Sequence, residues 1–126
     1  MLDDLRDLGP FDAERLGTHR LATLAAERIL TLVVDLAFAT NSHVAVAVLR
    51  QAPQTYTDSF TLAAEAKMID RDLADALLPS AGMRNVLVHN YLDIDYQQVA
   101  TAIPLAIEQY SEYVRQVARW LRERAE

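Results

Sequence analysis

The sequence predicts an all-α protein. Only three glycines and four prolines punctuate its 126 residues, so long helices meet few residues that would end them. Apolar residues recur at spacings of three and four, which is the period of a helix buried along one face. No internal repeat is visible, and 52% of the residues are apolar, which is ample for one buried core. We therefore expect a single helical domain over residues 1–126.

A long first helix is predicted from Asp12 to Ala39. Its main stripe consists of Leu21, Leu24, Ala25, Arg28 and Leu32, widened by Ile29, Val33 and Leu36. The segment Ile29–Ala39 is apolar on nearly every side, but it contains Asp35 and is about half the ~20 residues that a membrane span requires. Such a helix is either central to its own bundle or shared with a second copy of the chain.

Shorter helices are predicted in the middle of the chain. The polar residues 40–42 (Thr-Asn-Ser) are expected to break the first helix, and residues 51–54, which include a proline, are expected to form a loop. The predicted helices cover His43–Arg50, Thr55–Met68 and Arg71–Leu78. Asp70 is expected to cap the last of these, because its side-chain oxygen can accept an orphan backbone N–H.

Two more helices are predicted toward the C-terminus. Pro79 and Gly82 are expected to bend or interrupt the chain before a helix resumes over about 83–90. Pro104 fits best in the first turn of the last helix, where its missing N–H costs nothing, and a shorter helix from Asp95 is expected to precede it. The apolar face of the last helix consists of Ile103, Ile107, Tyr110, Val114, Val117 and Leu121. Residues 1–10 remain unassigned.

The composition limits the possible functions. A net charge of −6 argues against a protein that coats nucleic-acid phosphates with lysine and arginine, so any RNA must bind in a local cleft. With no cysteine, neither a disulfide nor a thiolate metal site can form, and neither a metal nor a cofactor is expected. Residues 1–5 are acidic where a secretory signal is basic, which predicts a cytoplasmic protein not inserted in a membrane.

The most informative segment runs from Gly82 to Tyr91. On a helix Asn85 and His89, four residues apart, share one side. Arg84 lies five residues before His89, about 140° round an ideal helix, so the two side chains converge poorly within one chain. A two-fold symmetric partner would solve this, because the same helix from two copies can place both residues around one cleft.

These residue types suit the cleavage of RNA without a metal. A histidine titrates near neutral pH and can take a proton from a ribose 2′-OH or give one to a leaving 5′-oxygen. An arginine can hold the phosphate oxygens bidentately and stabilise the extra negative charge of the transition state. Asn85 could orient the histidine ring or bind the phosphate. The expected products are a 2′,3′-cyclic phosphate and a free 5′-OH.

The segment from Arg84 to Tyr91, RNVLVHNY, resembles the RN-x-x-x-H-x-Y signature of HepT-like proteins of the HEPN superfamily. Upstream, residues 53–60 (PQTYTDSF) are similar to that family's P-x-x-Y-x-x-x-F segment. Asp35 and His43 also fall where the family shows an acid and a histidine on and after its first long helix. The similarity runs from about Leu21 to Leu121.

The resemblance implies a HEPN-type antiparallel helical bundle that dimerises, with the arginine and histidine lining a composite cleft at the dimer interface. It implies a toxin of a type II toxin-antitoxin system that cleaves RNA, with Arg84, His89 and Asn85 as catalytic residues. The partner implied is a minimal nucleotidyltransferase (MNT) antitoxin, which neutralises the toxin by transferring AMP to Tyr91.

Several alternatives stay open. Asp35, alone in an apolar helix, either pairs with Arg84 or another buried cation for structural reasons or supports the catalytic cleft, because an unpaired buried carboxylate is costly. Arg84 and His89 could themselves serve only as helix-terminal or ion-pairing residues. As a whole, the chain could instead be a catalytically silent helical module that docks a nucleotidyltransferase and presents Tyr91 or a nucleotide site to it, or a purely structural bundle.

Overall fold

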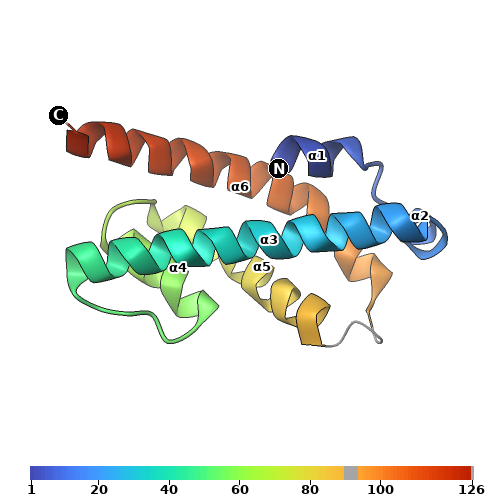
Figure 1. Ribbon diagram of the computed structural model, residues 1–126, viewed down its shortest axis with the longest axis horizontal. Coiled ribbons are helices and arrows are strands. Elements are labelled where there is room, and N and C mark those ends of the chain that lie inside the picture. The colour runs from blue at the N-terminus through green and yellow to red at the C-terminus, as the bar shows by residue number, and fades with distance from the viewer. Residues whose placement is uncertain (90–93, 126) are drawn as a thin grey trace.

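The structure, a computed structural model, describes residues 1–89 and 94–125 of the chain. All regular elements in these residues are helical. They are α1 (Leu2–Asp7), α2 (Ala13–Thr18), α3 (Arg20–Val44), the π-helical η1 (Ala45–Leu49), α4 (Tyr56–Glu65), α5 (Arg71–His89) and α6 (Tyr96–Ala125). Helix α3 runs the length of the molecule, and α5 returns against the direction of α3 and α6 (Figure 1). The prediction of an all-α bundle is confirmed.

The core lies where α3 meets α4, α5 and α6. Its large side chains, each at most 2% exposed, include Leu30, Val34, Phe60, Leu77, Ile103 and Tyr110, and burying each of them contributes roughly 1.5–3 kcal/mol. By length and composition alone, Arg20–Leu49 could cross a membrane. In this fold the same stretch forms α3 and η1. Helix α3 contacts every other helix, as predicted for a helix that is apolar on most sides.

The predicted break at residues 40–42 is wrong, because α3 continues through them to Val44. Asn41 is fully buried and its side chain links three helices. Its Nδ2 donates to Ser59 Oγ of α4 at 3.2 Å, and its Oδ1 accepts from the Tyr113 hydroxyl of α6 at 2.6 Å. An asparagine that would favour a turn in isolation is thus kept helical by partners that are distant in sequence.

The N-terminal part differs from the prediction in two ways. The single helix expected from Asp12 is divided at His19 into α2 and α3, although Asp12 does start α2 as its cap, accepting from the Arg15 N–H at 2.8 Å. The unassigned residues at the beginning form α1, which packs on α3 and α6 and buries Leu5 completely.

Helix α5 begins as predicted. Asp70 caps it by accepting the Leu73 N–H at 2.7 Å, and Gln116 of α6 fixes this cap through two hydrogen bonds of 2.8 Å to the Asp70 N–H and carboxylate. Helix α4 ends at Glu65 rather than Met68, because Lys67 adopts a left-handed conformation with φ 64°, which terminates a helix.

The predicted helix boundaries at Pro79 and Pro104 are wrong. Pro79 does not interrupt α5, and Pro104 lies well inside α6 rather than in its first turn, so no separate helix from Asp95 exists. A proline inside a helix costs ~3 kcal/mol. Both rings are exposed, while apolar neighbours such as Leu77 and Ile103 are fully buried, and this burial offsets the lost hydrogen bond. Arg84 and His89 therefore belong to one continuous helix.

The buried asparagine yields a stability prediction. Asn41→Ala should lower the free energy of unfolding by about 2–3 kcal/mol, because the hydroxyls of Tyr113 and Ser59 lose a buried partner. Ser42→Ala is the matched control: its hydroxyl only donates to the Phe38 carbonyl of its own helix, so its effect should stay below about 1 kcal/mol. Urea unfolding followed by circular dichroism measures both, and equal effects would contradict the assigned role of Asn41.

Candidate active site

The residues of the predicted site lie at the C-terminal end of α5. Arg84, Asn85 and His89 occupy its last two turns. Asn85 and His89 are exposed, whereas Arg84 is half-buried. Tyr91, the predicted modification site, lies outside the described residues.

Arg84 pairs with Asp35 of α3. Its Nε lies 2.8 Å from Asp35 Oδ1, with 18% of the arginine side chain and 33% of the aspartate side chain exposed. Of the cations that the sequence left open as partners of Asp35, the structure shows Arg84. Because both groups are partly removed from water, the loss of either partner would leave a poorly solvated charge.

Tyr56 of α4 completes the environment of the arginine, and sequence reasoning missed its role. Its hydroxyl donates to the same Asp35 Oδ1 at 2.8 Å. The Arg84 Cζ lies 4.6 Å from the centroid of the Tyr56 ring, within the range of a cation–π contact. Phe38 of α3 stacks on that ring with centroids 4.1 Å apart and an interplanar angle of 9°. The P-x-x-Y-x-x-x-F segment was the one signal that pointed to this tyrosine.

The electrostatics keep the Tyr56 phenol protonated. Burial, followed by the hydrogen bond to Asp35 and the negative charge of that carboxylate, raises the pKa of Tyr56 above its ordinary value. A phenol that is protonated at neutral pH serves as a hydrogen-bond donor. Asp35 thus accepts from two donors, one neutral and one cationic.

The structure brings Asn85 near Arg84 but directs His89 elsewhere. Asn85 Oδ1 lies 3.4 Å from Arg84 Nη1, a long contact. His89 is the last residue of α5, and its side chain is exposed. On one helix, a separation of five residues places it about 140° from Arg84, and among the described residues the side-chain hydrogen bonds of Arg84 go to Asp35 and Asn85 rather than to His89. The composite cleft therefore stays a prediction.

This arrangement offers three kinds of chemistry. Asp35 holds the guanidinium of Arg84 through Nε, and the two terminal nitrogens lie outside this contact. Phosphate binding requires such terminal donors. An exposed imidazole can exchange protons with a substrate, and an amide lies beside the arginine. Among residues 1–89 and 94–125, no group of three histidine, aspartate or glutamate side chains is placed to hold a metal ion.

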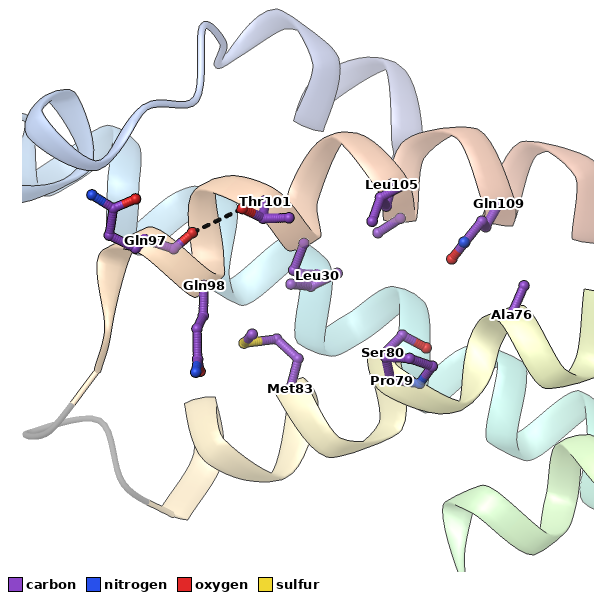
Figure 2. Close-up of a pocket in the computed structure, with 12 residues that line it drawn as sticks. Leu30, Ala76, Pro79, Ser80, Met83, Gln97, Gln98, Thr101, Leu105 and Gln109 are labelled. Atoms are coloured by element: carbon purple, nitrogen blue, oxygen red, sulfur yellow. Dashed lines mark hydrogen bonds between the residues drawn. The ribbon is translucent and has the colours of Figure 1, made fainter.

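A second feature, a groove between α5 and α6, has a volume of about 480 Å³. Figure 2 shows Met83 and Pro79 on one wall, Gln98, Thr101 and Leu105 on the other, and Leu30 of α3 between them. None of its lining residues is ionisable, so it offers neither an acid nor a base. The groove can bind a molecule but lacks the groups for general acid–base catalysis, which favours the Arg84 cluster as the candidate active site.

Comparison with known proteins gives consistent results. Residues 1–117 match the family described as Ribonuclease HepT-like. The chain is 37% identical over 98 residues to the tRNA nuclease HepT of Aphanizomenon flos-aquae, covering 78% of this chain and 67% of that protein. It is 32% identical over 62 residues to the mRNA nuclease HepT of Shewanella oneidensis, covering 49% of this chain and 47% of that protein.

A solved structure shares the fold. The HEPN toxin of Shewanella oneidensis, tri-AMPylated and in complex with an MNT antitoxin, superposes with a TM-score of 0.81 at 19% identity, covering 94% of this chain and 88% of that one. At this identity the likeness establishes the fold alone. The family match covers nearly the whole chain, so the protein belongs to the Ribonuclease HepT-like family and has the helical fold of the HEPN toxins.

Proposed function

We propose that the protein is the toxin of a type II toxin-antitoxin system, a cytoplasmic endoribonuclease that works without a metal or other cofactor. The observation that carries the proposal is the guanidinium of Arg84, which Asp35 and Tyr56 hold at the end of the helix that also bears His89. Family membership and the nuclease names of its relatives support it.

In the proposed reaction a ribose 2′-oxygen attacks the adjacent phosphorus. A base removes the 2′-OH proton, the bond to the 5′-oxygen breaks, and that oxygen receives a proton. His89 can serve as this acid or base. Arg84 binds the phosphate oxygens and stabilises their growing charge, and Asn85 orients the imidazole or the phosphate. The products are a 2′,3′-cyclic phosphate and a 5′-OH.

The proposal includes a homodimer with composite clefts. Residues 21, 28 and 35 are seven apart and therefore lie on one face of α3. This face starts with Leu21, which is 85% exposed, and the neighbouring Leu24 is 46% exposed. Exposed apolar side chains at the start of the face that also bears Arg28 and Asp35 favour contact with a second copy beside the site. Each cleft would then receive Arg84 from one protomer and His89 from the other.

The proposal also includes an MNT-type antitoxin as partner and Tyr91 as the residue that it modifies. The similar HEPN toxin of Shewanella oneidensis is tri-AMPylated and bound to an MNT antitoxin. An AMP group on Tyr91, two residues beyond His89 in sequence, would add a phosphodiester whose charge can occupy Arg84. The toxin would be silenced without unfolding.

The catalytic roles are tested by Arg84→Ala and His89→Ala. Each should lower RNA cleavage by at least about a thousand-fold, as loss of transition-state stabilisation or proton transfer does, while the helical circular-dichroism signal stays intact. Cleavage by the wild type should survive EDTA. Near-normal activity of either folded variant, or a strict need for a divalent ion, would contradict the mechanism.

The composite cleft is tested by mixing the two inactive variants. After subunit exchange, a heterodimer of Arg84→Ala with His89→Ala contains one cleft with both residues, so random mixing should restore about a quarter of wild-type activity. Light scattering should show a dimer before and after exchange. Mixtures that exchange subunits but remain inactive would rule out a cleft shared between protomers.

The modification site is tested by Tyr91→Phe. Co-expressed with its nucleotidyltransferase partner, the wild type should gain the mass of AMP on Tyr91 and lose RNA cleavage. Tyr91→Phe should remain toxic but escape this silencing, because it lacks the hydroxyl that accepts AMP. Peptide mapping that finds the adduct only at other residues would overturn the assignment.

A further inference from the structure

We propose that Tyr56 is a positioning residue for Arg84. Its ring sets the plane of the guanidinium and its hydroxyl restrains the Asp35 carboxylate, so that the two terminal nitrogens of Arg84 stay available to a phosphate. This inference rests on the proposed function, in which Arg84 binds the scissile phosphate.

The ring contact restricts the orientation of the guanidinium. Arg84 Cζ lies 4.6 Å from the centroid of Tyr56, and the Phe38 ring lies 4.1 Å from that same centroid. The Tyr56 ring is therefore packed against both Phe38, which stacks on it in parallel, and the guanidinium of Arg84. Because Phe38 is on α3 and Tyr56 on α4, the packing of these two helices supports the tyrosine. The guanidinium therefore rests on a platform that cannot easily tilt.

The hydroxyl contact determines how Arg84 pairs with Asp35. An arginine and a carboxylate often pair side by side through two parallel hydrogen bonds. Here Nε is the nitrogen of Arg84 that bonds Asp35, and Asp35 Oδ1 accepts from both Nε and the Tyr56 hydroxyl at 2.8 Å. The phenol thereby holds the carboxylate away from the two-bond arrangement, which would consume a terminal nitrogen of the arginine.

A neutral donor suits this task. Arg84 is only 18% exposed and needs a nearby anion, yet a two-bond ion pair would compete with the substrate phosphate for the same donors. Tyr56 shares the anion without adding charge, and the raised pKa of Tyr56 keeps its proton in place. Within the described residues, the other side-chain hydrogen bond of Arg84 is the long 3.4 Å contact of Nη1 with Asn85, which a phosphate can readily displace.

The kinetic test uses the full chain and a synthetic single-stranded RNA. Tyr56→Phe keeps the ring but loses the hydroxyl, and kcat should fall roughly ten-fold, as for the loss of one hydrogen bond to a charged group. Tyr56→Leu loses both contacts and should reduce kcat roughly a hundred-fold. Tyr113→Phe is the matched control: it also loses one hydroxyl hydrogen bond, to the buried Asn41, and should lower the melting temperature without changing kcat.

A double-mutant cycle separates positioning from a direct role. If Tyr56 acts through Arg84, Tyr56→Phe should change kcat by less than about two-fold in an Arg84→Lys background. Lysine has neither a planar group to stack on the ring nor separate nitrogens for Asp35 and for the phosphate. A ten-fold effect in both backgrounds would overturn the inference. So would full activity of both Tyr56 variants in an enzyme that Arg84→Ala inactivates.

A spectroscopic test needs no RNA cleavage. The Nε–Hε resonance of Arg84, assigned by its loss in Arg84→Lys, should move in Tyr56→Leu because the ring current disappears, and should exchange faster with water in Tyr56→Phe. An unchanged resonance in both variants would overturn the inference. If the wild type cleaves no RNA, the proposed function fails, whereas the resonance still decides whether Tyr56 positions Arg84.

Discussion

The site depends on one constraint, a carboxylate placed in the predominantly apolar segment Ile29–Ala39 of α3. Asp35 lies in the middle of α3 and is only one-third exposed, so it requires nearby donors. Arg84 of α5 and Tyr56 of α4 provide them, which means that three helices meet at a single oxygen atom. The requirement to satisfy this charge therefore also assembles the group that we propose binds phosphate.

A second polar link sets the register of α4 against α3. Asn41, two turns beyond Asp35, bonds Ser59, and Ser59 Oγ in turn donates to the Tyr56 carbonyl at 2.6 Å. Tyr56 and Ser59 are one turn apart, so α4 is attached to α3 at two successive points. Sliding α4 by one turn would break both contacts and would remove Tyr56 from beneath Arg84. The Asn41–Ser59 link and the candidate active site are thus parts of one arrangement.

The continuity of α5 has a functional consequence. Because Pro79 does not divide the helix, the orientation of Arg84 and His89 follows from the position of α5 in the bundle. That helix turns Arg84 inward onto Asp35 and leaves His89 exposed at its end. Because α5 points Arg84 and His89 in different directions within one chain, the two can act together only if a second copy completes the cleft or the substrate bridges the two side chains.

The sequence by itself determined the helical class, the cap at Asp70, the apolar character of α3 and the resemblance carried by Arg84 to Tyr91. These are local properties, set by spacing, capping chemistry and short motifs. Tertiary structure decided the rest: Asn41, Pro79 and Pro104 remain inside helices because burial of their neighbours and distant hydrogen bonds outweigh local preference. The pairing of Asp35 with Arg84 could be anticipated from the cost of a buried charge, but Tyr56 and Phe38 could not be assigned to that pair, since their contacts with Arg84 depend on how α3, α4 and α5 pack.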